Sequence, residues 1–170
     1  MPWYGSHRFL EEFIVGRGCR RLLEVGVYSG ENAVCMVGAA ARGVPVGEVE
    51  YYGFDFFRHY GRGVVAGRLA ATGCRFRLFE GDTRVTLPAA VGGLPPMDVV
   101  FIDGGKSVEV AGSDWECCSG LMHGESGVFF HNVGYPGVRR VVEGIPADAY
   151  RVEVFREPGE GEVALVTLRE

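Results

Sequence analysis

Lysine is nearly absent from this chain: Lys106 is the only lysine among 17 basic residues, and the other 16 are arginines. The basic residues are outnumbered by 22 acidic residues, which gives a formal net charge of −5. Proteins whose main task is nucleic-acid binding usually carry a basic excess, so this class is disfavoured. An arginine side chain stays protonated, whereas a lysine amine can give and take a proton. The place of Lys106 in the fold therefore bears directly on the chemistry.

Long uncharged apolar runs are missing as well. No window approaches the roughly 18 apolar residues of a membrane span, although 47% of the residues are hydrophobic. The first residues, MPWYGSHRFLEEF, lack the basic-then-apolar layout of a secretory signal. The five cysteines are odd in number and have neither a zinc spacing nor a redox spacing, which predicts buried reduced thiols. We therefore expect a cytoplasmic protein with no membrane partner.

Segments typical of strands alternate with segments typical of helices along the chain. The predicted strands span 21–25, 50–55, 75–80, 97–102, 128–131, 150–155 and 162–168. The predicted helices span 6–15 with Ser6 as cap, 31–41, 62–71, 107–122 and 137–144, and 83–96 holds at most a short helix. This order predicts an α/β fold: a Rossmann-like, doubly wound, seven-stranded, mostly parallel sheet whose last strand is antiparallel. We expect one domain over 1–170, with 1–20 as a short N-terminal helical extension.

The stretch RLLEVGVYSGEN, residues 21–32, is the centre of the predicted site. An apolar run leads into Gly26 and Gly30 and then into a helix-compatible segment, which is typical of a buried strand, a tight turn and a helix N-terminus. Such a turn lets a ligand contact bare backbone, because glycine has no Cβ. The spacing E-x-G-x-x-x-G differs from the G-x-G-x-x-G of dinucleotide sites, and Glu24 is a carboxylate where a pyrophosphate would lie. The pattern favours a ligand without phosphates, particularly a cationic one.

Polar residues follow each predicted parallel strand. In a doubly wound sheet the ligand lies outside the carboxyl ends of the strands. The polar strand-end residues are Glu24, Asp55, Gly81 with Asp82, Asp103 to Lys106, and His131 with Asn132. Each of them alone is an ordinary turn residue, but five strand ends of this kind together predict a shared site. Asp55 is placed to accept the ribose hydroxyls of a nucleoside.

Three motifs carry a resemblance to a known family. E-V-G-V-Y-S-G, residues 24–30, resembles motif I of class I S-adenosylmethionine-dependent methyltransferases. F-E-G-D-T at 79–83 and M-D-V-V-F-I-D-G-G-K at 97–106 resemble the small-molecule O-methyltransferases related to catechol and caffeoyl-CoA O-methyltransferases. F-F-H-N-V at 129–133, with G-V-R-R-V-V-E at 137–143, is similar to related methyltransferase domains with an F-I-D-G-x-H signature. The resemblance implies S-adenosylmethionine as cofactor and a small-molecule hydroxyl as methyl acceptor.

The resemblance also implies roles for individual residues in cofactor binding. Gly26 and Gly30 let the backbone approach the amino-acid part of the cofactor, and Tyr28 and Asn32 lie near its carboxylate or sulfonium. Asp55 holds the ribose, while Gly81 and Asp82 border the adenine. The full implied set is Glu24, Gly26, Val27, Tyr28, Gly30, Asn32, Asp55, Phe56, Gly81, Asp82, Thr83 and Asp103.

The implied catalytic residues follow the fourth and fifth strands. Asp103 matches a carboxylate that binds a divalent metal, Mg²⁺ or Mn²⁺, and Lys106 matches the lysine that takes the hydroxyl proton of the substrate. His131 and Asn132 fall where the catechol-type enzymes have an Asp-Asn pair that completes the metal site. An imidazole at this place moves the metal preference from Mg²⁺ toward Mn²⁺, Fe²⁺ or Zn²⁺. Two alternatives stay open: no metal with His131 as general base, or a strand-end histidine bonded to backbone.

The sequence thus predicts a methyltransferase acting on a small-molecule hydroxyl, with Lys106, Asp103 and His131 as catalytic residues. About twenty residues precede the first strand, whereas the catechol and caffeoyl-type relatives have longer helices there that wall the acceptor pocket. A catalytically inactive cofactor-binding or partner subunit is therefore the alternative function. An open pocket would suit a larger or saccharide-like acceptor. Otherwise a second subunit would cover it through Trp3 and Tyr4, as a homodimer. A nucleotide-linked oxidoreductase is disfavoured by Glu24 and by the missing middle glycine.

Overall fold

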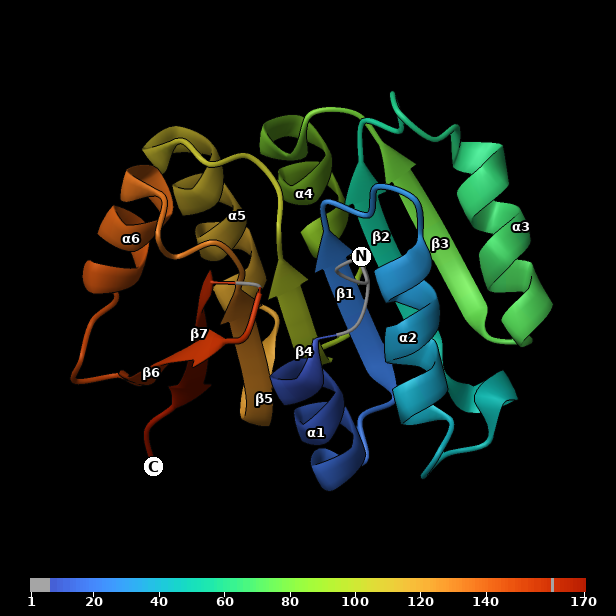
Figure 1. Ribbon diagram of the computed structural model, residues 1–170, viewed down its shortest axis with the longest axis horizontal. Coiled ribbons are helices and arrows are strands. Elements are labelled where there is room, and N and C mark those ends of the chain that lie inside the picture. Colours follow the sequence, from blue (N-terminus) through green and yellow to red (C-terminus); the bar gives the residue numbers. More distant parts are fainter. Residues whose placement is uncertain (1–6, 160) are drawn as a thin grey trace.

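A computed structural model describes residues 7–159 and 161–170 of the chain. It contains a seven-stranded sheet in the order β3-β2-β1-β4-β5-β7-β6, with helices on both faces (Figure 1). The strands are β1 (Arg21–Val25), β2 (Glu50–Asp55), β3 (Arg75–Glu80), β4 (Met97–Ile102), β5 (Met122–Phe130), β6 (Tyr150–Glu157) and β7 (Gly161–Leu168). The helices are α1 (Arg8–Arg17), α2 (Glu31–Ala40), the 3-10 helix η1 (Val46–Glu48), α3 (Arg62–Thr72), α4 (Thr83–Val91), α5 (Val108–Ser119) and α6 (Pro136–Glu143).

The strand directions confirm the predicted fold class. Strands β1 to β5 pair in parallel, and β7 is antiparallel to both β5 and β6. In the centre of the sheet, Val25 of β1 lies opposite Phe54 of β2 and Ile102 of β4. The carboxyl ends of these three strands therefore meet at one edge, as a Rossmann-like sheet requires for its ligand site.

The sheet is covered on both faces, so its central strands β1 and β4 are mostly apolar. Leu22 and Leu23 point to opposite faces because side chains alternate along a strand. Leu22 belongs to the core layer under α1, α2 and α3, which also contains Phe101. Leu23 belongs to the layer under α4, α5 and α6, which also contains Phe54. These two layers hold the strand ends, and with them the site, in place.

The bounds of β1 to β4 agree with the prediction, but the later elements differ from it. Helix α5 ends at Ser119 rather than at residue 122, and β5 begins at Met122 rather than at residue 128. The polar segment at the start of β5 does not alternate like a strand. It is held by the Ser126 hydroxyl, which accepts from the His123 amide (2.8 Å) and donates to the Met97 carbonyl (2.6 Å). Such a pairing is made by tertiary contact and leaves no periodic signal.

Helix α1 departs from the prediction, whereas α4 is the short helix that the prediction allowed within 83–96. Helix α1 begins at Arg8, with His7 as an N-cap that makes no side-chain capping bond. The predicted cap Ser6, like Trp3 and Tyr4, lies outside the described residues. Helix α4 has nine residues despite Pro88 in its interior, and the Asp82 side chain caps it by accepting from the Arg84 amide at 3.0 Å.

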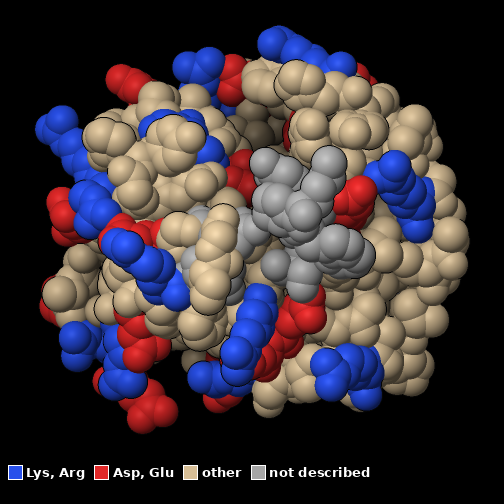
Figure 2. Space-filling view, in the orientation of Figure 1, with Lys and Arg blue, Asp and Glu red and all other residues tan. Residues whose placement is uncertain are grey.

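Charged side chains of both signs are interspersed on the face shown in Figure 2. Exposed ion pairs such as Arg20–Glu48 (2.9 Å) and Arg8–Glu12 (2.8 Å) are of the kind that contributes little to stability. Within the described residues, no helix has both the length and the apolar character needed to cross a membrane.

Candidate active site

A cleft of about 1480 Å³ opens at the carboxyl edge of β1, β2 and β4. It is larger than most single-ligand sites, which span roughly 300–1,000 Å³. The predicted site residues that line it are Gly26, Tyr28, Asp55, Phe56, Asp82, Thr83, Asp103 and Lys106. The other predicted residues, Glu24, Val27, Gly30, Asn32, Gly81, His131 and Asn132, do not line it. The structure therefore brings together one part of the predicted set and places the rest in the supporting shell or elsewhere.

The glycine turn after β1 is packed directly against the end of β4. Gly26 has φ +87°, and a Cβ at this position would lie 2.1 Å from the Asp103 carbonyl oxygen. The Asp103 amide in turn donates to the Val25 carbonyl at 2.8 Å. Gly30, with φ +82°, would place a Cβ 3.1 Å from Val65. The packing of the fold therefore requires glycine at both positions, whether or not a ligand also contacts this turn.

Asp55, at the end of β2, organises the backbone around the cleft. One carboxylate oxygen accepts from the amides of Val27 (2.7 Å) and Tyr28 (2.9 Å), and the other accepts from the amide of Phe57 (2.7 Å). Tyr28 and Phe57 have φ of 54° and 53°, a left-handed conformation that costs a non-glycine residue about 1–2 kcal/mol. The Asp55 carboxylate therefore stabilises two strained positions while it also lines the cleft.

Glu24 lies beneath the glycine turn rather than on the cleft surface. Its side chain is buried and accepts hydrogen bonds from the Tyr51 hydroxyl and from the Asn32 amide nitrogen, the latter at 2.8 Å. Burial, together with the nearby charges of Asp103 and Asp55, raises the pKa of Glu24 to about 8, although these two hydrogen bonds act to lower it. Three carboxyl groups thus lie within electrostatic reach of one another at this edge of the sheet. A pKa of about 8 leaves Glu24 mostly protonated near neutral pH, so Asp55 and Asp103 carry the negative charge that favours a cationic ligand.

The raised pKa of Glu24 makes stability fall as the pH rises. The carboxyl titrates at an ordinary value of 4.5 in an unfolded chain and at about 8 in the folded protein. Its contribution is therefore full below about pH 4.5 and is lost as the pH rises through about 8. Glu24→Gln removes this titration. We expect the melting temperature of the variant, relative to that of the native protein, to increase steadily between pH 5 and pH 8.5.

The comparison uses differential scanning fluorimetry at a series of pH values. A glutamine has one acceptor oxygen for the two donors Tyr51 and Asn32, so the melting temperature of the variant should lie below that of the native protein at acid pH. Only the change of this difference with pH tests the assignment. Glu125→Gln serves as control, since Glu125 is exposed and paired with Arg17. A difference in melting temperature between Glu24→Gln and the native protein that stays constant from pH 5 to pH 8.5 would contradict the assignment.

Asp103 joins Lys106 and His131 into one hydrogen-bonded cluster. The same oxygen of Asp103 accepts from the Lys106 ammonium at 2.7 Å and lies 3.1 Å from Nδ1 of His131. Burial alone would raise the pKa of Asp103, but the hydrogen bond with His131 and the charge of Lys106 outweigh it and lower that pKa. Lys106 lines the cleft, whereas His131 is buried behind Asp103 against the rings of His7 (4.8 Å) and Phe101 (5.8 Å).

The predicted metal ligands do not converge on one point. His131 directs Nδ1 at Asp103, and the Lys106 ammonium already lies on the same carboxylate oxygen. Asn132 lines a separate cavity. Over residues 7–159 and 161–170, no three His, Cys, Asp or Glu side chains are arranged to hold a metal ion. A donor set with an ammonium at the shared oxygen does not fit a divalent cation, so we derive no step through one. The ligand set Asp103, His131 and Asn132 stays a prediction.

Residues of α3 and of the loop before it also line the cleft, and most of them were not predicted as site residues. Arg68 donates to the Ser29 carbonyl at 2.6 Å, and its guanidinium lies 5.7 Å from the Tyr60 ring. Tyr60 in turn packs edge-on against Tyr28 at 5.1 Å. Tyr60 belongs to the aromatic and arginine-rich segment after β2, a signal visible in the sequence. Arg68 is one of 16 arginines, and no local pattern in the sequence distinguishes it from the others.

Comparisons with known proteins agree with this geometry. Residues 23–133 match a family model described as a methyltransferase domain. The crystal structure of the O-methyltransferase TomG from Streptomyces achromogenes, involved in tomaymycin synthesis and in complex with SAM, has a TM-score of 0.79 and 21% identity over 95% of this chain and 78% of that chain. The structure of an O-methyltransferase from Bacillus cereus in complex with SAH has a TM-score of 0.80 and 17% identity, over 99% of this chain and 84% of that chain.

A third structure, of apo CalS11, a TDP-rhamnose 3'-O-methyltransferase of calicheamicin biosynthesis, gives a TM-score of 0.77 and 18% identity over 95% of this chain and 77% of that chain. A comparison with curated proteins finds no match. The structural likeness supports the fold, and the family model covers most of the chain, including the glycine turn and the end of β5. The chain therefore belongs to the methyltransferase domain family, the class I S-adenosylmethionine-dependent methyltransferases that its motifs predict.

Proposed function

We propose that this protein transfers the methyl group of S-adenosylmethionine to a hydroxyl group of a small molecule. The observation that carries the proposal is the position of Lys106, which lines the cleft with its amine 2.7 Å from Asp103. A lysine that only supports the fold does not need a partly buried carboxylate partner at the wall of a ligand cleft. The similar structures of TomG and of the Bacillus cereus protein, both O-methyltransferases in complex with SAM or SAH, support the same reaction class.

The cofactor would lie across the carboxyl edge of the sheet. The carboxylates of Asp55 and Asp103, which line the cleft, favour the positively charged sulfonium of the cofactor. Asp55 lines the cleft, and backbone amides use three of the roughly four lone-pair sites of its carboxylate, which leaves about one for a ribose hydroxyl. Phe56, Asp82 and Thr83 line the same cleft and would border the adenine. The surplus volume of the cleft leaves room for an acceptor beside the cofactor.

The reaction we propose is an in-line displacement at the methyl carbon. The acceptor oxygen forms a bond to that carbon as the carbon–sulfur bond breaks, which gives a methyl ether and S-adenosylhomocysteine. Lys106 would accept the hydroxyl proton in its neutral amine form, after its ammonium has released a proton to solvent, and Asp103 would stabilise the ammonium that forms again. His131 is buried behind Asp103, so its proposed role is to orient this carboxylate. Most of the rate enhancement in this scheme comes from holding the two reactants in line.

Lys106→Met tests the proton-acceptor role. Methionine keeps much of the apolar stem and removes the amine, so methyl transfer should fall by about 100-fold or more, while S-adenosylhomocysteine affinity changes by less than about threefold. Transfer from labelled S-adenosylmethionine is measured over a panel of phenols, catechols and glycosides. Arg62→Met, an exposed change at the start of α3, is the control. Cofactor binding with no transfer to any acceptor, and no effect of Lys106→Met, would instead favour an inactive partner subunit.

Arg68→Ala should weaken cofactor binding without removing any group from the sheet edge. The guanidinium holds the Ser29 carbonyl next to the glycine turn, and its loss frees that turn. A hydrogen bond to a charged group contributes about 1.5–3 kcal/mol, which corresponds to a 10- to 100-fold weaker affinity. Calorimetric titration with S-adenosylhomocysteine measures the effect, with Arg62→Ala as the matched control on the same helix. Equal affinities for the two variants would show that Arg68 plays no part in ordering the turn.

A homodimer and a cytoplasmic location stay predictions. Three aromatic side chains at the lip of the cleft are exposed: Tyr28 by 53%, Phe56 by 43% and Tyr60 by 36%. Their exposure supports the idea that either the acceptor or a second subunit covers this lip.

A further inference from the structure

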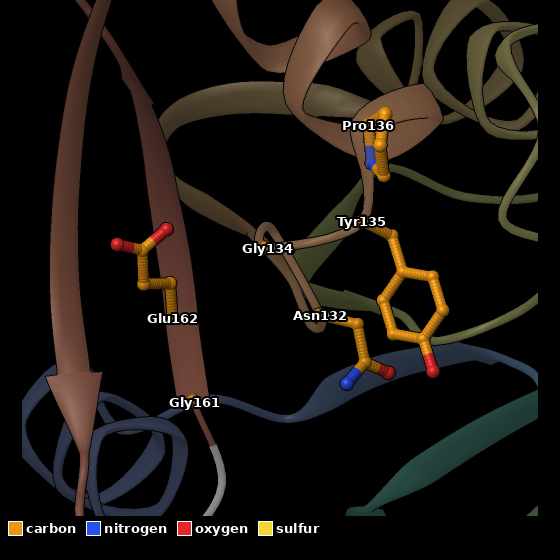
Figure 3. Close-up of a pocket in the computed structure, with 6 residues that line it drawn as sticks. All are labelled: Asn132, Gly134, Tyr135, Pro136, Gly161 and Glu162. Carbon is orange, nitrogen blue, oxygen red and sulfur yellow. The ribbon is translucent and has the colours of Figure 1, made fainter.

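A second, smaller cavity of about 300 Å³ lies between the loop after β5 and the start of β7 (Figure 3). Asn132, Gly134, Tyr135, Pro136, Gly161 and Glu162 line it. It shares no lining residue with the cofactor cleft. Its volume is at the lower end of small-molecule sites, which suits a single ring and not a nucleoside cofactor.

This cavity and the catalytic cluster lie on the two sides of one wall. Asn132, which lines the cavity, directly follows His131, which is bonded to Asp103. The first turn of α6 forms the rest of the wall: a Cβ at Gly137 would lie 2.1 Å from the Lys106 carbonyl oxygen. The backbone of the proposed proton acceptor is thus in contact with the helix whose N-terminus lines the cavity.

The walls of the cavity are held in place by the fold. The Val133 amide donates to the Glu162 carbonyl at 3.0 Å, and the Tyr135 amide donates to the Asn132 carbonyl, also at 3.0 Å. The Glu162 carboxylate is bound by the guanidinium groups of Arg139 and Arg156. Asn132 has a left-handed φ of 58°. Strained conformations of this kind persist where the surroundings fix them, often at functional sites. A cavity with fixed walls needs little ordering on binding.

The cavity has an apolar wall and polar groups at its edge. Tyr135, with 53% of its surface exposed, and Pro136 supply the apolar part. Figure 3 shows the Asn132 amide next to the Tyr135 ring, and the Glu162 side chain on the opposite side of the cavity. The Asn132 amide offers donors and an acceptor, and the Glu162 carboxylate keeps acceptor capacity beyond its arginine bonds.

This combination matches a polyhydroxylated ring, which has an apolar C–H face and hydroxyl groups along its edge. A fully apolar ring would cover the Asn132 and Glu162 side chains without bonding them, which is costly. We propose that the cavity binds a pyranose ring of the methyl acceptor that is not itself methylated, because a wall separates the cavity from the catalytic cluster. This inference rests on the proposed function only for the assignment of the ring to the acceptor.

The test is ligand-observed saturation-transfer NMR with methyl α-L-rhamnopyranoside and methyl β-D-glucopyranoside, each with and without S-adenosylhomocysteine. We expect transfer to at least one of the two in the native protein, reduced by about fivefold or more in Tyr135→Ala and in Asn132→Gly. Glycine at 132 keeps the left-handed backbone and removes the amide. Val154→Ala, an exposed change on β6, is the control and should leave the signal unchanged.

Calorimetric titration of the same samples with S-adenosylhomocysteine separates the two proposals. Normal cofactor binding with no signal from either pyranoside would overturn the sugar site and leave the proposed function intact. A signal that persists unchanged in both Tyr135→Ala and Asn132→Gly would also overturn it, because the ring would then lie elsewhere. Absence of cofactor binding would count against the proposed function, while the pyranoside signals would still decide on the cavity.

Discussion

Gly26→Ala is expected to abolish cofactor binding and to lower the free energy of unfolding by about 3 kcal/mol. The new methyl group would lie 2.1 Å from the Asp103 carbonyl oxygen and 2.6 Å from its carbon, and both are backbone atoms of a central strand end. The φ of +87° adds strain for any residue with a Cβ. Relief requires β1 and β4 to separate at the edge where the cofactor is proposed to lie.

Chemical denaturation and titration with S-adenosylhomocysteine measure the two effects of Gly26→Ala. Gly38→Ala in α2 is the matched control, because nothing lies within 4 Å of its Cβ position. This control should raise stability by up to about 1 kcal/mol, since alanine is the better helix former. Native-like stability and native-like cofactor affinity in Gly26→Ala would show that the close packing of β1 on β4 is not as described.

Asp55→Ala should weaken binding of S-adenosylhomocysteine by about 100-fold or more. It removes the carboxylate proposed to hold the ribose, and it leaves the amides of Val27, Tyr28 and Phe57 without their acceptor. Asp55→Asn keeps one acceptor oxygen, which can serve the Val27 and Tyr28 amides or the Phe57 amide, but not both sides. Its affinity should therefore lie between those of the native protein and Asp55→Ala.

Asp98→Ala separates loss of stability from loss of binding. Asp98 also accepts from two backbone amides, those of Arg20 (2.8 Å) and Arg21 (2.9 Å), at the opposite edge of the sheet. Its removal should destabilise the protein by about 1–3 kcal/mol while the affinity for S-adenosylhomocysteine is preserved. If Asp98→Ala and Asp55→Ala reduced the affinity equally, the effect of Asp55 would be one of stability alone.

The sequence predicted the parallel core well because apolar runs with polar ends define β1 to β4. The same property places Asp55 and Asp103 at one edge, since the carboxyl ends of parallel strands converge. The family resemblance then gave the chemistry of that edge. The start of β5 was not predictable, because Ser126 holds it through side-chain bonds to backbone groups of two other positions.

Contacts between residues that are distant in the chain could not be predicted from the sequence. Glu24 meets Tyr51 only because β1 and β2 are neighbours in a register that no local pattern records. Burial makes it a supporting group rather than a cleft residue. Asn132 follows His131 in the chain but faces a different cavity, because its left-handed backbone turns the side chain away. The separation of these two residues is the reason that the predicted metal ligands do not converge.

A crystal structure of the protein with S-adenosylhomocysteine is the most direct test of the account. We predict a ribose hydroxyl within hydrogen-bonding distance of the Asp55 carboxylate, and the sulfur on the side of the cleft formed by Asp103 and Lys106. A ligand bound outside this cleft, with Asp55 contacted only by the amides of Val27, Tyr28 and Phe57, would contradict it.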